Sequence, residues 1–199
     1  MNRFRIITPA EWRRMPWRNG LGTTMEIATD AAAPDAPWSW RLSIADVPAR
    51  AAFSAFAGFD RWLLCREGAG MRVAFGDEPG QPVPHANAPG PALAFRGEDA
   101  ATGEPLGPGV RDLNLFAARE RWAGELTVAA PGTALPPADV LLVHALAAVR
   151  VRLGGAEVAL GPGDTLVAAA AAGAAPAAGP LELPPGGPAL AVARLHRRG

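Results

Sequence analysis

The sequence predicts an all-β fold made of two related units. Short apolar segments recur along the 199-residue chain, and turn residues separate most of them. Gly and Pro are frequent, at 23 and 21 residues, and segments with a helical period of apolar residues are scarce. Many short strands at this spacing are typical of a sandwich or barrel. A weak internal repeat indicates that the strands form two units.

Most of the predicted elements are strands. The first spans residues 23–28, where polar and apolar side chains alternate directly after the turn signal Asn19-Gly20. Further predicted strands span residues 38–47, 61–65, 71–75, 92–95, 111–116, 140–146, 149–153 and 157–160. One helix of about two turns is predicted over residues 9–15, with Thr8 as its N-cap and Pro16 as its end.

The repeat aligns residues 63–76 with residues 141–154 without gaps. Each copy consists of a strand, a turn of small residues and a second strand. We therefore place a first unit at residues 1–118 and a second, diverged unit at residues 119–199. The turn GPGD at Gly161–Asp164 resembles the Pro-Gly-Asp turn of cupin barrels. With the repeat, this resemblance implies a cupin-like (RmlC-like) β-barrel or jelly roll in a compact two-unit bicupin.

Charge and cysteine content narrow the class of protein. The 19 basic and 19 acidic residues cancel, which argues against nucleic-acid binding and against a basic membrane surface. A small-molecule partner is favoured instead. Cys65 is the single cysteine, so the chain forms no internal disulfide. The N-terminal residues lack the apolar core of a signal peptide, and we expect a cytoplasmic protein.

The chain lacks the residue patterns of metal sites and of nucleophilic catalysis. Metal-dependent cupins hold their ion with a His-x-His pair, a Glu and a later His. Here the three histidines, His85, His144 and His196, are far apart. No Gly-x-Ser-x-Gly elbow occurs, and Cys65 lies in an apolar strand. We therefore predict no metal, no cofactor and no established catalytic residue.

Three predicted strands carry polar side chains on one face. They are Thr24 and Glu26, Arg41 and Ser43, and Asp112 and Asn114. Such faces either meet water, as one side of many antiparallel sheets does, or line the mouth of a barrel. In the second case Arg41 binds a carboxylate. The pattern alone leaves both interpretations open.

Five segments resemble signatures of the HutD/Ves family, in the same order and at similar spacing. They are MPWRNGLGTTMEI, WSWRLSIADV, AAFSAFAGFDRWLL, PALAFRGE and RDLNLF, within residues 15–116. The family is similar to cupins in fold and is associated with bacterial histidine-utilisation gene clusters. The resemblance implies a non-enzymatic protein that senses an intermediate of histidine catabolism, such as urocanate or a formylated or formimino glutamate, and moderates the pathway.

The resemblance also implies the residues of the site. The ligand-binding positions that it carries over are Asn19, Thr24, Glu26, Arg41, Ser43, Arg61, Asp112 and Asn114. We expect one pocket in which Arg41 lies between the carboxylates of Glu26 and Asp112.

Three alternatives about activity and assembly stay open. The first is a metal-independent isomerase or hydrolase with Glu26 or Asp112 as general base. The second is a protein-interaction module with a patch of Trp12, Trp17 and Trp38. A homodimer also stays open, because cupins pair through sheet edges.

Overall fold

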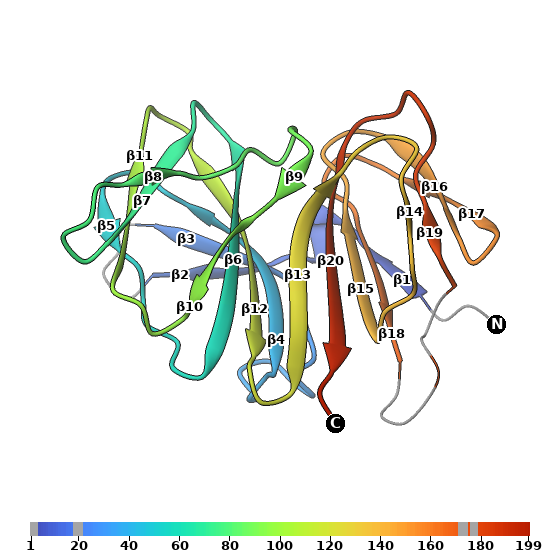
Figure 1. Ribbon diagram of the computed structural model, residues 1–199, viewed down its shortest axis with the longest axis horizontal. Helices are drawn as coiled ribbons and strands as arrows, with labels where there is room; N and C mark the ends of the chain where they lie inside the picture. The colour runs from blue at the N-terminus through green and yellow to red at the C-terminus, as the bar shows by residue number, and fades with distance from the viewer. Residues whose placement is uncertain (1–3, 18–21, 171–174, 176–178) are drawn as a thin grey trace. The chain divides into compact units, whose positions relative to one another are not determined.

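The computed structural model describes residues 4–17, 22–170, 175 and 179–199. Asn19 and Gly20, which the sequence assigns to a tight turn, lie outside the described residues. Within the described part the chain forms strands β1 to β20 and the short 3-10 helix η1, Pro9–Glu11 (Figure 1). No helix of this part is long and apolar enough to cross a membrane.

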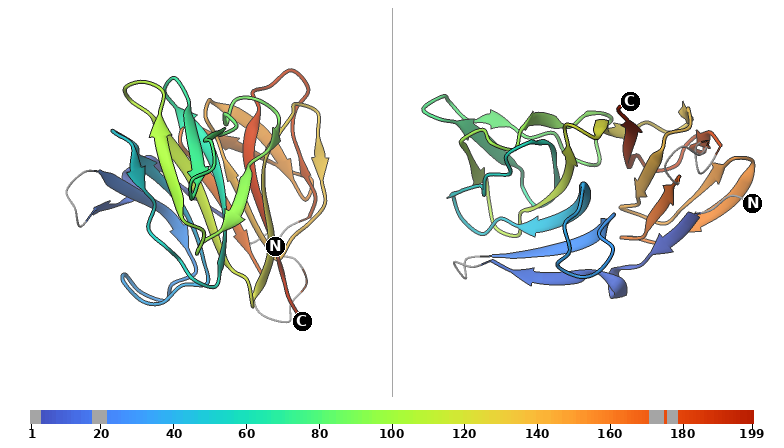
Figure 2. Two further views of the ribbon diagram at one scale, coloured as in Figure 1. Left: turned by 60° about the vertical axis from the view of Figure 1, so that its left-hand side comes forward. Right: turned by 90° about the horizontal axis from the view of Figure 1, so that it is seen from below.

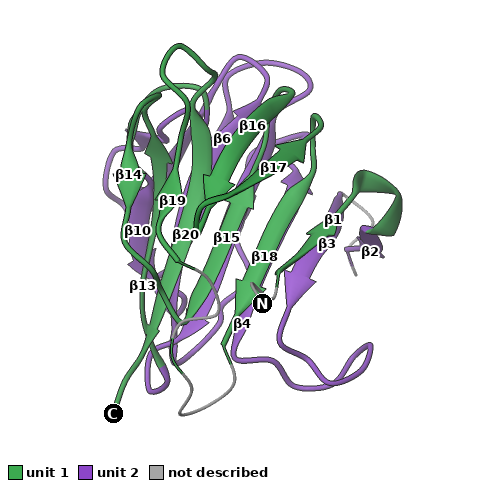
Figure 3. Ribbon diagram, turned by 90° about the vertical axis from the view of Figure 1, so that its right-hand side faces the viewer, with its two compact units in different colours: residues 1–11, 87–91, 122–199 green, residues 12–86, 92–121 purple. Residues whose placement is uncertain are grey.

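Contacts divide the chain into two compact units (Figure 3). Unit 1 holds residues 1–11, 87–91 and 122–199, and unit 2 holds residues 12–86 and 92–121. The division therefore falls between Arg121 and Trp122 and places two earlier segments with the C-terminal part. The domains expected at residues 1–118 and 119–199 stay a prediction.

Unit 2 consists of two antiparallel sheets that face each other (Figure 2). The six-stranded sheet has the order β10 (Leu93–Arg96), β6 (Phe59–Glu67), β12 (Arg111–Ala118), β4 (Trp40–Asp46), β3 (Thr23–Thr29), β2 (Arg13–Pro16). The four-stranded sheet has the order β5 (Ala51–Ala52), β11 (Ala101–Pro105), β7 (Met71–Phe75), β8 (Gln81–Pro82). Leu63 and Cys65 of the first sheet pack with Met71 and Val73 of the second in a buried cluster.

Unit 1 also consists of a six-stranded and a four-stranded sheet. The larger sheet has the order β1 (Phe4–Ile7), β18 (Thr165–Ala169), β15 (Val140–His144), β20 (Leu190–Arg197), β13 (Trp122–Ala129), β9 (Gly90–Pro91). The smaller sheet has the order β14 (Ala134–Leu135), β19 (Leu181–Glu182), β16 (Val149–Leu153), β17 (Ala156–Leu160). Leu153, Leu166, Leu181 and Val192 are among the fully buried aliphatic residues of its core.

Eight strands of each unit follow the same topology. In unit 2 the order β10-β6-β12-β4 occurs in one sheet and β5-β11-β7-β8 in the other. In unit 1 the orders are β18-β15-β20-β13 and β14-β19-β16-β17, and the strands follow one another along the chain in the same sequence. This double-sheet arrangement is a jelly roll. Each sheet keeps two edge strands, so the predicted barrel is not closed by strand pairing.

The helix predicted over residues 9–15 is wrong. Only one 3-10 turn forms, in which the backbone N–H and hydroxyl of Thr8 donate to the Glu11 carboxylate at 2.8 and 3.1 Å. Strand β2 then begins at Arg13, because residues 13–16 pair with residues 23–26 of β3. Sheet pairing overrides the local helical pattern at this position.

Candidate functional site

A cavity of about 390 Å³ lies in unit 2, on the inner face of the six-stranded sheet. Six of the predicted site residues line it, namely Thr24, Arg41, Ser43, Arg61, Asp112 and Asn114. Cross-strand register brings them together, because β12 pairs with both β4 and β6. Ser43 lies opposite Asn114, and Arg41 and Arg61 each lie opposite Phe116. Alternation along each strand then points these side chains to one face.

Glu26 does not line this cavity. It lines a neighbouring cavity of about 530 Å³, to which Arg13, Asp35 and Arg41 also contribute. Arg13 bridges two carboxylates there, donating from Nε to Glu26 Oε1 at 3.0 Å and from Nη1 to Asp35 Oδ1 at 2.7 Å. The single pocket expected from the sequence is thus divided in the structure. Arg41 lines both cavities, with Asp112 in one and Glu26, paired with Arg13, in the other. Asn19, the eighth predicted position, lies outside the described residues.

A buried hydrogen-bonded chain joins Arg61 to Asp112 through Asn114. Arg61 donates from Nε and Nη2 to Asn114 Oδ1, with the Nε contact at 3.0 Å. Asn114 Nδ2 in turn donates to Asp112 Oδ1, and the backbone N–H of Ala45 donates to the same oxygen at 3.2 Å. Asp112 Oδ2 has no hydrogen-bond partner among the described residues. One carboxylate oxygen is thus fixed by two donors and the other is free to accept.

Burial shifts the pKa of both charged ends of this chain. It raises the pKa of Asp112 to about 6, against the opposing effects of the Arg61 charge and of donors from Asn114 and Ala45. It lowers the pKa of Arg61 to about 10, although the Asp112 charge acts in the other direction. At neutral pH both groups are therefore charged, and they balance each other.

Arg41 differs from Arg61 in having no polar partner. The residue is 8% exposed, and no hydrogen bond or ion pair joins it to another residue in the described part of the chain. Its Nε is buried without an acceptor. Burial lowers the pKa of Arg41, with the Glu26 charge opposing. The result is a desolvated cation in the cavity wall whose donors are available to an anion.

Aromatic rings hold both guanidinium groups. The guanidinium carbon of Arg41 lies 4.6 Å from the Trp38 ring centroid and 5.0 Å from that of Phe116. The guanidinium carbon of Arg61 lies 4.1 Å from the Phe53 centroid and 4.9 Å from that of Phe116. Cation–π contacts of this kind fix the guanidinium planes and leave the N–H groups at their edges for hydrogen bonds.

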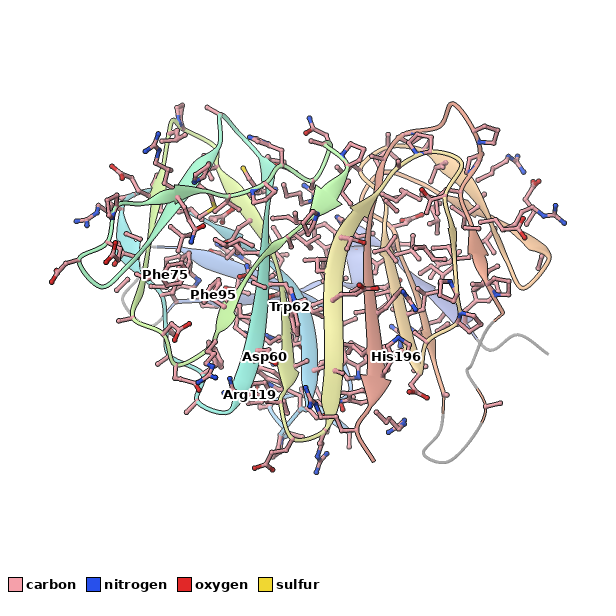
Figure 4. The ribbon with its side chains drawn as sticks, in the orientation of Figure 1. Asp60, Trp62, Phe75, Phe95, Arg119 and His196 are labelled. Atoms are coloured by element: carbon pink, nitrogen blue, oxygen red, sulfur yellow. The ribbon has the colours of Figure 1, made fainter. Side chains whose placement is uncertain are left out.

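The sequence-based prediction missed these aromatic residues as parts of the site. Phe116 follows Asn114 by two residues on the same strand, so the alternation that identified Asp112 and Asn114 also points to it. Phe53 and Phe56 lie outside the regular strands, and no periodicity places them. Phe95, which also stacks on Arg61 at 5.2 Å, is supported by an edge contact with Phe75 (Figure 4).

The cavity is not lined by Cys65, His144 or His196. Cys65 is fully buried in the core of unit 2, and burial together with the Asp112 charge raises the pKa of its thiol to about 11. His144 is buried and hydrogen-bonded to Thr165 in unit 1, and His196 lies near the end of β20 (Figure 4). The described residues contain no cluster of three or more His, Cys, Asp or Glu that could hold a metal ion.

A jelly roll with a polar cavity on the inner face of one sheet defines a cupin-like protein. A solved cupin 2 conserved barrel domain protein from Leptotrichia buccalis has the same fold at 10% identity, with a TM-score of 0.55 over 96% of this chain and all of that one. The HutD family model matches residues 9–182, and the chain belongs to the HutD family.

Relatives of similar length support the family assignment. A 21.2 kDa protein from the hutC 3' region of Pseudomonas putida is 35% identical over 160 residues, which cover 79% of this chain and 82% of the relative. The solved structure of HutD from Pseudomonas fluorescens SBW25 is 28% identical, with a TM-score of 0.81 over 99% of this chain and all of that one. A conserved protein of unknown function from Pseudomonas aeruginosa PAO1 is 32% identical, with a TM-score of 0.83 over 98% and 99% of the two chains.

Proposed function

We propose that this protein is a non-enzymatic binding protein for a small carboxylate formed in histidine catabolism, and that binding moderates histidine utilisation. Membership of the HutD family and the origin of a relative from a hutC region support the link to this pathway. Urocanate and the formylated or formimino derivatives of glutamate are the ligands to test first, because each carries a carboxylate and nitrogen.

The unpartnered guanidinium of Arg41 is the observation that carries this proposal. A buried cation without a hydrogen-bonded carboxylate costs folding free energy, and the charge of Glu26, which is paired with Arg13, offsets only part of the desolvation of Arg41. Placed in the wall of a cavity between Trp38 and Phe116, Arg41 gains its missing partner when a carboxylate enters. The free energy that burial of Arg41 costs in the free protein is partly recovered when an anion binds, and this makes the cavity selective for anions.

Neutral polar groups supply the remaining contacts with the ligand. Ser43 follows Arg41 by two residues on β4, so both side chains lie on the same face of the sheet, and both line the cavity. The Thr24 hydroxyl accepts a hydrogen bond from Trp17 Nε1 at 2.9 Å, so its own hydrogen points elsewhere and can be donated. These groups orient the ligand, while the aromatic rings exclude water from it.

One specific observation favours a second function, that of a metal-independent isomerase or hydrolase. The pKa of Asp112, raised by burial to about 6, is close to that of an effective general base. Glu26, the other carboxylate considered for this role, is outside the cavity and paired with Arg13. Turnover of a pathway compound that stops in Asp112→Asn would establish this second function in place of the first.

Thermal unfolding of the purified protein tests the proposal. Histidine, urocanate, formiminoglutamate, formylglutamate, glutamate and formate are added separately. A ligand at 100 times its Kd stabilises the native state by about 2.7 kcal/mol, which raises the midpoint by roughly 5–10 °C for a chain of this size.

Two variants make the test specific to the cavity. In Arg41→Gln the shift with the active compound should vanish. In the matched control Arg150→Gln, which changes an exposed arginine paired with Glu157 in unit 1, the shift should persist. Equal shifts in wild type and Arg41→Gln, or no shift with any compound, would overturn the proposal.

A further inference from the structure

Asp112 presents one free oxygen in a cavity that also holds the free cation of Arg41. All recorded hydrogen bonds to its carboxylate end on Oδ1, which accepts from Ala45 N and Asn114 Nδ2. These donors come from β4 and from Asp112's own strand, so they fix the plane of the carboxylate. Oδ2 has no hydrogen-bond partner among the described residues and is not one of their fully buried unpaired atoms, so it is open to a donor in the cavity that Asp112 lines.

The two unsatisfied groups lie at different levels of the same sheet. Arg41 lies opposite Phe116 on β12, and Asp112 lies opposite Ala45 on β4, four residues further along that strand. At about 3.4 Å per residue the two backbone positions are separated by roughly 13–14 Å along the strands. Both side chains line the same cavity, so a ligand that contacts both has an anionic end and a donor end.

We propose that Asp112 is a specificity-determining residue that accepts a hydrogen bond from an N–H group at the end of the ligand remote from its carboxylate. This inference rests on the proposed function, since it concerns the same cavity, and it narrows the ligand to carboxylates with a remote N–H donor. A carboxylate of the same size and shape without that donor leaves Oδ2 unpaired and binds more weakly. A site built to hydrogen-bond a ligand N–H rejects analogues that lack it for this reason.

The charged and titratable groups around Asp112 allow its carboxyl group to be ionised, and therefore to accept a hydrogen bond, at neutral pH. Arg61 and Cys65 face it from β6, and Arg41 and Asp46 belong to β4. The Arg61 charge favours the carboxylate form, whereas burial and Asp46 disfavour it. Asp112 therefore accepts from the ligand above about pH 6 and loses this ability when it protonates.

The test compares urocanate with 3-(3-furyl)acrylate, which has the same length and carboxylate, a ring oxygen in place of the remote N–H and a C–H in place of the other ring nitrogen. Dissociation constants are measured by calorimetry at pH 8. We expect wild type to bind urocanate at least about tenfold more tightly, the effect of one unsatisfied buried hydrogen bond. The pair N-formylglutamate and 2-formyloxyglutarate, in which an ester oxygen replaces the amide N–H, serves in the same way if urocanate is not bound.

Asp112→Asn replaces the hydrogen-bond acceptor that faces the ligand with a donor. Because Ala45 N and Asn114 Nδ2 both donate to one oxygen, the single oxygen of the amide must stay on their side, and its NH₂ then points into the cavity. In this variant the ratio of the affinity for urocanate to that for the furan analogue should fall to about one or below. Binding of the furan analogue itself should persist. An unchanged ratio in a folded Asp112→Asn protein would overturn the inference.

Two further arms keep the result interpretable. If Asp112→Asn does not fold, the ratio of N-formylglutamate to 2-formyloxyglutarate affinity is measured in wild type at pH 8 and pH 5, since the amide N–H does not titrate and the carboxyl groups of the two ligands titrate alike. The ratio should fall at pH 5, and a constant ratio would contradict the inference. Arg41→Gln separates the two proposals. If the carboxylates bind equally well to wild type and Arg41→Gln, the proposed function fails. If binding needs Arg41 but the affinity ratio does not depend on Asp112, only the role of Asp112 is rejected.

Discussion

The two units share eight strands in one order, yet their interiors differ. Residues 63–76 of unit 2 align with residues 141–154 of unit 1, and the strand registers extend this match to the neighbouring strands. The pair Ser43 and Asn114 of unit 2 thereby corresponds to Glu125 and Arg194 of unit 1. Glu125 and Arg194 form an ion pair at 2.7 Å, whereas Arg41 of unit 2 has no such partner in the described chain.

The difference separates an interior packed with aliphatic side chains from one that contains a polar cavity. Unit 1 fills the space between its sheets with aliphatic side chains, and the cation of Arg194 has a carboxylate. Unit 2 also has a buried aliphatic cluster, but it places polar groups and aromatic rings around a cavity. The jelly roll tolerates both arrangements, so the cavity is not a requirement of the fold. The cost of the cavity in packing and in a cation without an ion-pair partner is therefore not imposed by the fold.

The largest expected effect comes from weakening the packed interior. Leu166→Ala removes a fully buried side chain from unit 1 and should lower the free energy of unfolding by about 2–5 kcal/mol, the range for Leu→Ala in cores. Urea denaturation followed by circular dichroism measures it. Ser43→Ala, at the cavity of unit 2, is the control and should cost about 1 kcal/mol or less. Equal costs at both sites would remove the distinction between the interiors.

The second-largest loss of stability is expected at Arg61, whose guanidinium is hydrogen-bonded to Asn114. Arg61→Met leaves Asn114 Oδ1 without its two donors and removes the cation that balances Asp112. We expect a loss of about 3 kcal/mol in unfolding free energy at pH 7.5, the cost of leaving one partner of a buried charged network unsatisfied. Urea titration measures the loss. A change below about 1 kcal/mol would mean that Arg61 contributes little to the unit.

Much of this architecture follows from local patterns. Period-2 alternation and frequent turns predict the all-β fold, and the same alternation groups Arg41 with Ser43 and Asp112 with Asn114. It cannot tell whether a polar face meets water or a cavity, because that depends on how the sheets pack. The pairing of Arg13 with Glu26 was also out of reach, since it requires the register between β2 and β3. At β2 the local helical pattern was misleading for the same reason.

A smaller effect is the pH dependence that Asp112 confers on stability. Its folded-state pKa of about 6 lies above its ordinary value, so the native state holds the proton more tightly than the unfolded chain. The resulting stabilisation is complete below about pH 4 and is lost as the pH rises through about 6. Wild type should therefore lose on the order of 2 kcal/mol relative to Asp112→Asn between pH 4 and pH 7. Parallel stability curves for the two proteins, from urea titrations at each pH, would contradict this.

The smallest change in stability is expected at Arg41. Whether the change is a loss or a gain tells whether this cation stabilises the fold. Arg41→Met exchanges an unpaired buried cation for an apolar side chain of similar length, so it removes a desolvation cost while losing cation–π contacts with Trp38 and Phe116. The unfolding free energy should stay within about 1 kcal/mol of wild type or rise. Thermal and urea unfolding without ligand measure it. A protein that is as stable as wild type but no longer responds to carboxylates would identify Arg41 as a group kept for binding. A loss comparable to that of Arg61→Met would instead make Arg41 part of the structural framework of unit 2.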